Sequence, residues 1–484
     1  MAVRKNLSMM GLAHFIAFVL NFASVIVVSR LLTPEEIGIY SVSVAILGLA
    51  HIFRDFGVGQ YLVQAQTVGK TEFRAALSIT LYASWLIALV LFLVREPLAT
   101  LYQHDGVSQV LGILCINFIV LPFGTPLLSM MQRELQFHFL ALNLGLSTLV
   151  QTSVTIACAY AGQSFLSMAW GALAAHLAKL VWLNIMRPGE IFIWPTLRGL
   201  KSTLHFGSLA SLASIIREVG TSSSDLILGR TLGFSEVAFL SRANGLNKML
   251  LTRVVALVRG VYFPTFANEL RNGADGAKLY SRSMCYLVAI TGPALAVMAI
   301  TSEPLILFLF GEQWQRSVPL AMLICFYAML VTPYSLYSLS LVAAGHVKRN
   351  LWVEVIIQTV QVLVLLSSIW WPLERVVMLL GLVALTQIAC AQSALKKTFG
   401  LTMAAHLKSL APSLLLIPFS ASGPAILMYL AQSHGFSEQR LLILLLSGAL
   451  AVSGWAIGIF VTRHPMRTEV MHGLSTLKSK YKPC

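Results

Sequence analysis

Residues 24–41 read SVIVVSRLLTPEEIGIYS, and residues 224–241 read SDLILGRTLGFSEVAFLS. The two stretches agree without a gap at five pairs of positions, which are Ser24/Ser224, Arg30/Arg230, Leu32/Leu232, Glu36/Glu236 and Ser41/Ser241. Both copies have an apolar helix, an Arg near its end, a short loop with an acid, and a second apolar helix. Because the match falls twice at the same place in the hydropathy pattern, it indicates an internal repeat. A membrane chain made of two similar halves is typical of a transporter with a site between the halves.

The composition places the chain in a membrane. Apolar residues make up 57% of its 484 residues and charged residues 11%, and the mean hydropathy is +0.79. These values exclude a soluble globular protein. Apolar runs of about 18–25 residues recur along the chain, and each is long enough to cross a hydrocarbon core about 30 Å thick. The first run is too long for the apolar region of a cleaved signal peptide, so we expect it to be the first membrane helix.

The apolar runs predict an all-α, polytopic membrane protein with about fourteen transmembrane helices. The expected spans are 7–29, 38–53, 75–94, 108–128, 139–160, 165–186, 206–229, 238–264, 283–302, 319–343, 350–371, 375–395, 410–430 and 441–462. The repeat relates two six-helix lobes, residues 1–200 and 201–398, and an additional helix pair, 399–462, follows them. The segments 54–74 and 303–318 are ambiguous, because re-entrant or interfacial helices would look similar.

The net charge of +15 is a topology signal. Alternate loops on one side of the predicted membrane hold about 22 Lys and Arg residues, and the opposite loops hold about six. The positive-inside rule therefore places both termini in the cytoplasm and argues against a nucleic-acid partner. The basic tail 463–484 is expected to lie on anionic lipid headgroups.

Catalytic motifs are absent from the sequence. It has no Walker motif, no HExxH and no GxGxxG after a strand, and its longest connectors, of about 15–20 residues, are too short to fold as domains. The six cysteines show no metal-ligand spacing. We therefore expect neither an enzyme nor a bound cofactor or metal.

Ionisable side chains inside the predicted spans are the main functional candidates, because each is costly in a membrane unless it is paired or hydrated. The seventh span, 206–229, carries Arg217, Glu218 and Asp225, and helical periodicity places the two acids on one face. These acids either pair structurally with neighbouring cations or take up a proton or sodium ion.

The eighth span, 238–264, carries the cations Arg242, Lys248, Arg253 and Arg259. Two acids against five cations in the two spans leave a surplus of positive charge, which must be hydrated or paired with a ligand. Some of these side chains near the span ends could reach the membrane surface. A cationic cavity at mid-membrane favours an anionic ligand, and the donors of Arg match the oxygens of a phosphate.

Other polar residues in the spans have simpler interpretations. Lys179 reads as a lysine that reaches the membrane surface, and Glu354 as an interfacial ion-pair partner of Lys348 or Arg349. His51 and His176 read as isolated core or interfacial histidines.

The N-terminal stretch carries a resemblance to a known family. Asn6 and Gly11, followed by SRLLTPEEIGIYSVSVAILGL (29–49) and RDFGVGQ (54–60), resemble the polysaccharide-transporter family of lipid-linked oligosaccharide flippases. The wider superfamily also contains multidrug exporters of the MATE type and lipid II flippases. The resemblance implies a V-shaped, two-lobed protein of the bacterial inner membrane. Such a protein moves an undecaprenyl-diphosphate-linked sugar unit by alternating access, for exopolysaccharide or O-antigen synthesis. Implied partners are the lipid-linked oligosaccharide, membrane lipids and polysaccharide-assembly enzymes.

The resemblance also implies site residues. The cation-lined cavity of the family corresponds here to Arg217, Arg242, Lys248 and Arg253, and through the repeat to Arg30. Arg54 and Asp55 lie where the second helix meets the cytoplasm and would suit an inner gate. One departure is that the first helix carries only Asn21 in its middle, so the positive charge is expected mainly in one lobe.

Three alternatives remain from the sequence. A drug exporter of the same fold would favour an acidic and aromatic cavity, against which the five cations argue. A membrane-embedded polysaccharide polymerase would need large external loops, which the sequence lacks. A lipid II flippase is compatible with the sequence, which does not identify the sugar.

Overall fold

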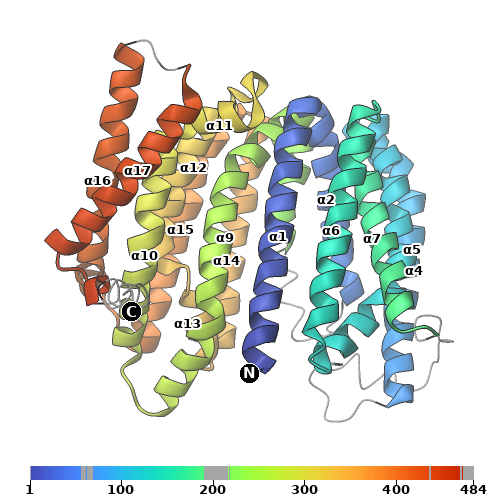
Figure 1. Cartoon of the computed structure of the whole chain (residues 1–484), viewed down its shortest axis with the longest axis horizontal. Coiled ribbons are helices and arrows are strands. Elements are labelled where there is room, and N and C mark those ends of the chain that lie inside the picture. The colour runs from blue at the N-terminus through green and yellow to red at the C-terminus, as the bar shows by residue number, and fades with distance from the viewer. Residues whose placement is uncertain are drawn as a thin grey trace, which may run out of the picture. The chain divides into compact units, whose positions relative to one another are not determined.

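The computed structural model describes residues 2–55, 62, 69–189, 216, 218–434, 438–468 and 471. All regular elements in these residues are helices (Figure 1). Eleven of them are long and apolar enough to cross a membrane, which confirms an all-α, polytopic membrane protein. They coincide with eleven of the expected spans. The other three expected spans are 38–53, which falls in α2, 238–264, which falls in α9, and 206–229. Residues 206–215 and 217 of the last span lie outside the described residues. The total of fourteen therefore stays a prediction.

The chain divides into two compact units, Met1–Ala238 and Phe239–Cys484. The described helices of the first unit are α1 (Ala2–Leu31), α2 (Pro34–Asp55), α4 (Lys70–Tyr102), α5 (Asp105–Arg133), α6 (Phe137–Tyr160), α7 (Leu166–Met186) and the helix 218–231. In this unit α1 packs along α6, as Figure 1 shows, and α6 packs on α7. The pair α4 and α5 contacts α2, and α5 and α2 also contact α7.

The second unit contains most of α9 (Phe234–Arg271) and the helices that follow it. These are α10 (Gly276–Ile300), α11 (Ser302–Phe310), α12 (Ser317–Val331), α13 (Tyr337–Ala343), α14 (Val347–Leu366), α15 (Leu373–Phe399), α16 (Met403–Ser433) and α17 (Arg440–Val461). Here α10 packs against α12 and α16, α14 against α15, and α16 against α17. The ambiguous segment 303–318 holds α11 and a short 3₁₀ turn, Glu312–Trp314, and α11 has only nine residues, too few to span a bilayer.

The two copies of the sequence repeat break at matching places. One helix ends at residue 31 and the next begins at Pro34, and in the other copy these positions are 231 and Phe234. The sequence interpretation placed the acid of each copy in the loop, but Glu36 and Glu236 lie in the first turn of α2 and α9. The reason in the first copy is a capping box, in which Thr33 and Glu36 satisfy backbone donors at the start of α2. Pro34 suits the first helical position because its missing N–H is not needed there.

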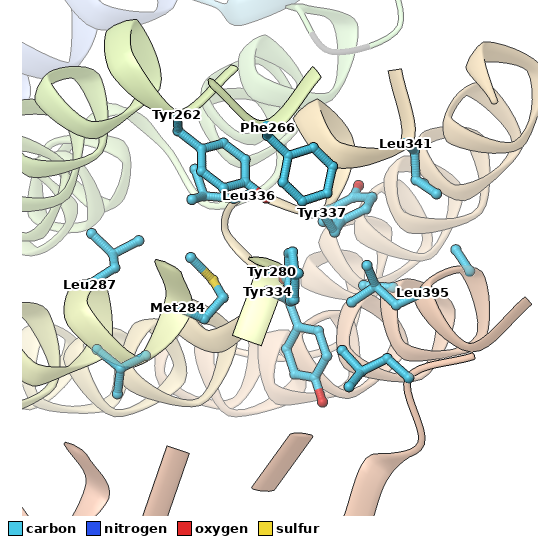
Figure 2. Packing of buried hydrophobic residues seen from close by; sticks show 14 of the residues in the cluster. Tyr262, Phe266, Tyr280, Met284, Leu287, Tyr334, Leu336, Tyr337, Leu341 and Leu395 are labelled. Carbon is cyan, nitrogen blue, oxygen red and sulfur yellow. The ribbon is translucent and has the colours of Figure 1, made fainter. Parts of the chain in front are cut away.

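The core of the second unit is rich in tyrosine. Tyr262, Tyr280, Tyr334 and Tyr337 pack with Phe266, Met284 and several leucines (Figure 2). Each hydroxyl group has a hydrogen-bond partner, so the rings are buried without leaving a polar atom unsatisfied. The partners are Ser340 for Tyr262, the Pro333 carbonyl for Tyr280, Gln392 for Tyr334 and Glu354 for Tyr337.

Candidate functional site

The helix 218–231 packs closely along α2 through glycine residues. A Cβ added at Gly38 would lie 1.9 Å from the carbonyl oxygen of Phe234, at the start of α9. A Cβ at Gly229 would lie 2.5 Å from a methyl group of Val42. Since α2 and the helix 218–231 run in opposite directions, these contacts follow one antiparallel interface. The seventh expected span is thus packed, in its described part, on the second one.

Glu218, a predicted ion-coupling or pairing residue, lies at this interface. A Cβ at Gly48 of α2 would be 2.9 Å from Glu218 Oε1 and 3.0 Å from Ser222 Oγ. The Ser222 hydroxyl donates to Glu218 Oε1 across 3.3 Å. Within the described part of the chain, no Lys, Arg or His nitrogen lies within 4.0 Å of this carboxylate. The carboxylate therefore rests against α2 at Gly48, where an added Cβ would require the end of the Glu218 side chain to shift.

The neighbouring candidates are described in part. Asp225 is half-buried on the helix 218–231. Arg217 lies outside the described residues. Arg30 is exposed in the last turn of α1.

The cations of α9 are spread over its length. The Arg242 guanidinium lies over the rings of Trp314 and Phe310, 5.2 and 5.7 Å from their centroids. Such contacts stabilise a cation by the negative face of the ring. Lys248 is exposed, and Arg253 has a described backbone in α9 but no described side chain. The predicted gathering of these cations in one cavity stays a prediction.

A basic cluster in the first unit was not predicted. His51 and Arg54 are three residues apart on α2, and His176 and Lys179 are three residues apart on α7, which contacts α2. The side chains of Lys179, His51 and Arg54 lie near enough to His176 to interact with it electrostatically. The His51 ring also stacks on Phe118 of α5, with centroids 4.7 Å apart. The two histidines are therefore not isolated, as the sequence interpretation had them.

The members of the cluster are partly or fully buried. Arg54 is 9% exposed, and Lys179 is half-buried. Among the described residues, no carboxylate oxygen lies within 4.0 Å of the Lys179 ammonium group. The matching patterns HIFR (51–54) and HLAK (176–179) on two expected spans were the available signal. Asp55 ends α2, but its side chain lies outside the described part of the structure.

Glu354 is not the interfacial ion-pair partner that the sequence suggested. It is 9% exposed in the second unit, and its Oε1 accepts a 2.9 Å hydrogen bond from the Tyr337 hydroxyl. In the described ranges, no basic nitrogen lies within 4.0 Å of it. Tyr337 reaches this carboxylate because the break at Pro333 separates α13 from α12 and turns it toward α14.

Two apolar cavities lie beside α10. One, of about 460 Å³, is lined by α9 and α10, and among its described lining residues Glu269 is the one that carries a charge. The other, of about 350 Å³, is lined by α10, α16 and α17 and contains Pro293 and Trp455. Their linings suit hydrocarbon rather than a charged group.

The fold is that of a known class of membrane transporters. It is similar to the lipid II flippase MurJ, with a TM-score of 0.75 and 11% identity, over 95% of this chain and 99% of that one. It is also similar to a MATE family multidrug transporter of the MOP superfamily, with a TM-score of 0.61 and 15% identity, over 79% of this chain and 96% of that one. At these identities the likeness establishes the fold alone.

The sequence places the chain within a family of that fold. Residues 27–319, more than half of the chain, match the polysaccharide biosynthesis protein family, and the chain belongs to this family. It is 22% identical to the lipopolysaccharide biosynthesis protein WzxC of Escherichia coli (strain K12), over 66% of this chain and 65% of WzxC. It is 24% identical to the succinoglycan biosynthesis transport protein ExoT of Rhizobium meliloti (strain 1021), over 72% of this chain and 71% of ExoT. The chain thus spans about two thirds of the length of these relatives.

Proposed function

We propose that this protein is a flippase that moves an undecaprenyl-diphosphate-linked oligosaccharide across the bacterial inner membrane for exopolysaccharide or O-antigen synthesis. Its family and the names of its relatives support a role in polysaccharide assembly. The basic cluster of Arg54, Lys179 and two histidines carries the proposal, because basic side chains gathered away from the aqueous surface favour an anionic ligand.

The mechanism that fits is alternating access. With both termini in the cytoplasm, Arg54 and Lys179 lie in the cytoplasmic halves of their helices, where a diphosphate would enter. Arg54 and Asp55 would form the inner gate. Arg217, Arg242, Lys248, Arg253 and Arg30 would hold the diphosphate during passage. The lipid tail would stay in the bilayer, and the apolar linings of the cavities beside α10 would suit hydrocarbon. Uptake of a proton or sodium ion by Glu218 or Asp225 would drive the cycle.

Deletion of the gene tests the proposal. We expect loss of surface polysaccharide, with complete lipid-linked repeat units accumulating on the cytoplasmic leaflet of the inner membrane. Normal polysaccharide together with altered sensitivity to cationic compounds would instead support a drug exporter. Loss of polymer with repeat units delivered to the outer leaflet would support a polymerase.

Variants of the cations refine the test. Lys179→Ala should reduce polysaccharide output at least tenfold, since the anion loses a cationic partner, while Lys179→Arg should keep part of it. The exposed Lys408→Ala serves as the control and should be unaffected. Arg253→Ala should abolish transport, and Arg253→Lys should be inactive if the paired donors of Arg are needed. Normal output from well-expressed Lys179→Ala and Arg253→Ala proteins would contradict these roles.

A coupling role for Asp225 predicts that Asp225→Asn makes export insensitive to pH and to sodium. An unchanged dependence on both would make Asp225 a structural residue.

A further inference from the structure

The cavity between α9 and α10 has a polar end and an apolar end. Near the turn that joins the two helices, its lining contains the polar residues Thr265, Glu269 and Ser283. Farther from this turn the lining is apolar and includes Val258, Val261, Leu287 and Ile290. Tyr262 and Phe266, whose rings pack together (Figure 2), also line the cavity, and the Tyr262 hydroxyl is already bonded to Ser340.

The length of the cavity matches one leaflet of a membrane. Its lining on α9 extends from Val258 to Glu269, which is about 16 Å at 1.5 Å per helical residue. Half of a hydrocarbon core is about 15 Å thick. Under the expected topology the Arg271 end of α9 is cytoplasmic, so the polar end lies at the membrane surface and the apolar end near mid-membrane. This gradient suits an amphiphile with its headgroup at the surface and a hydrocarbon chain directed inward.

The cavity is open at the protein surface. Val261 in its lining is 69% exposed, and Ile290 is 42% exposed. Pro264 lies inside α9 within the stretch that lines the cavity, and prolines bend helices. This bend is a physical reason why two consecutive antiparallel helices leave space between them. The hydrocarbon chain of a neighbouring lipid can therefore enter the cavity from its side.

Glu269 favours one kind of headgroup. It is exposed, and among the described residues no Lys, Arg or His nitrogen lies within 4.0 Å of its carboxylate. Lys278, near the start of α10, is paired with Asp275 at 3.7 Å instead. A carboxylate attracts an ammonium group and repels a headgroup that carries only a phosphate. This preference opposes that of the surrounding basic loops, which attract anionic lipids.

We propose that the cavity between α9 and α10 binds one phospholipid with an amine headgroup, of which phosphatidylethanolamine is the simplest. One acyl chain lies along the apolar lining, and the headgroup ammonium lies at Glu269. Thr265 and Ser283 lie at the level of the ester groups. The lipid is a resident component of the protein and not its cargo, so this inference goes beyond the proposed function.

Native mass spectrometry of the full-length protein tests the headgroup. The detergent-solubilised protein is incubated with equal amounts of phosphatidylethanolamine and phosphatidylglycerol that carry the same acyl chains, and the ratio of the two lipids in the singly bound complex is measured. We expect a severalfold excess of the ethanolamine lipid. Glu269→Gln should abolish this preference, and Glu269→Lys should reverse it. Glu35→Gln, which removes an exposed carboxylate of α2, is the control and should keep the wild-type ratio.

A second pair of variants tests the place of the acyl chain. Val261→Trp should lower the retention of both lipids severalfold, because the larger side chain fills the cavity. Val181→Trp, at a valine of α7 with similar exposure, should leave retention unchanged. Equal lipid ratios in wild type and Glu269→Gln would overturn the headgroup assignment. Undiminished retention in Val261→Trp would overturn the cavity as the place of binding.

Two other occupants are distinguishable in the same measurement. Undecaprenyl phosphate in excess should not displace the ethanolamine lipid, and displacement would show that the cavity holds the tail of a polyprenyl carrier, which would overturn the proposal. A dimer that is present in wild type and lost in Val261→Trp would show that a second copy of the chain covers the cavity, which would overturn it as well. None of these readouts depends on polysaccharide output, so failure of the proposed function would leave the lipid site standing.

Discussion

The indole Nε1–H of Trp455 donates a 2.8 Å hydrogen bond to the carbonyl oxygen of Ala289. That carbonyl lies four residues before Pro293 in α10, and proline has no N–H with which to satisfy it. The donor that α10 lacks is therefore supplied by α17. Because Ala289 is fully buried, water does not replace this bond, and the contact holds α17 against α10 within the second unit.

A double-mutant cycle tests this relationship. Trp455→Phe should lower the free energy of unfolding by about 1–3 kcal/mol, the usual cost of leaving a buried carbonyl unsatisfied. In a Pro293→Ala background the same change should cost less, because the restored backbone N–H of residue 293 satisfies Ala289. Chemical unfolding of the detergent-solubilised proteins measures both values. Equal costs in the two backgrounds would show that Trp455 acts through packing alone.

Local and periodic features of this fold were predictable from the sequence. Apolar runs located eleven helices, because backbone groups in a membrane must be satisfied within the segment and long apolar runs leave helix as the solution. The repeat located matching helix breaks at residues 32–33 and 232–233, since identical residues at equal spacing impose the same local structure. The error over Glu36 was avoidable, because T-P-E-E has the spacing of a capping box.

Contacts between distant segments were not predictable. Nothing in the run AILGLAHIFR (45–54) states that Gly48 faces Glu218, because the partner of a glycine is set by tertiary packing. His51 and His176 likewise became a cluster through the packing of α2 on α7. We expected an ion pair for Glu354 because it is near Lys348 and Arg349 in the sequence. In the structure its carboxylate instead accepts a hydrogen bond from Tyr337, which lies on another helix, α13.

Glu36 and Glu35 provide a matched pair of variants at the start of α2. Glu36 Oε2 accepts from the Thr33 backbone N–H at 2.6 Å and from the Thr33 hydroxyl at 2.9 Å, and its Oε1 accepts from the Ser164 hydroxyl. Glu35 is exposed. Glu36→Gln should lower the midpoint of thermal unfolding at neutral pH, because weaker hydrogen bonds replace charge-assisted ones. The expected loss in the free energy of unfolding is about 1 kcal/mol. Glu35→Gln should have little effect. Equal midpoints for the two variants would contradict the stabilisation of the start of α2 by the hydrogen bonds of Glu36.

The pH dependence of this effect has a defined sign. Glu36 precedes the expected span 38–53. Burial alone would raise its pKa, but the hydrogen bonds from Ser164 and Thr33 outweigh burial and hold the pKa below its ordinary value of 4.5. A lowered carboxyl pKa contributes stability that is present above pH 4.5 and is lost as the pH falls through the folded-state value. The difference between wild type and Glu36→Gln should therefore shrink in that acidic range.

Gly38 should tolerate no side chain. An added Cβ would lie 1.9 Å from the Phe234 carbonyl oxygen, which is backbone and cannot rotate away. Gly38→Ala should therefore separate the start of α2 from the start of α9 and cost at least about 1–3 kcal/mol, the range for overpacked contacts. Thermal unfolding measures the loss. Gly11→Ala, with no neighbour near the added Cβ, is the control and should be neutral. Comparable stability of the two variants would argue against the close approach.

His464 should make stability depend on pH. It is 1% exposed and follows the candidate span that ends at Val461. Its Nδ1 accepts from the Met466 backbone N–H at 3.1 Å, so its proton is assigned to Nε2, which donates to Ser413 Oγ at 2.9 Å. Ser413 in turn donates to the Cys285 carbonyl at 2.7 Å. Protonation of Nδ1 would remove the first of these bonds, so the folded state favours the neutral ring.

The sign of the His464 effect follows from proton binding. Burial lowers the pKa of His464 from its ordinary value of 6.5, so between the two values the unfolded chain binds more protons than the folded one. The stability contributed by His464 is therefore complete above pH 6.5 and declines as the pH falls toward the folded-state pKa. Over this range, the free energy of unfolding of wild-type protein should fall more steeply than that of His464→Gln. The control is His434→Gln, at an exposed histidine, and its stability should fall as steeply as that of wild type. Unfolding midpoints in detergent, measured from pH 7.5 downward, compare the three proteins. Parallel curves for wild type and His464→Gln would mean that the ring is not held in its neutral form.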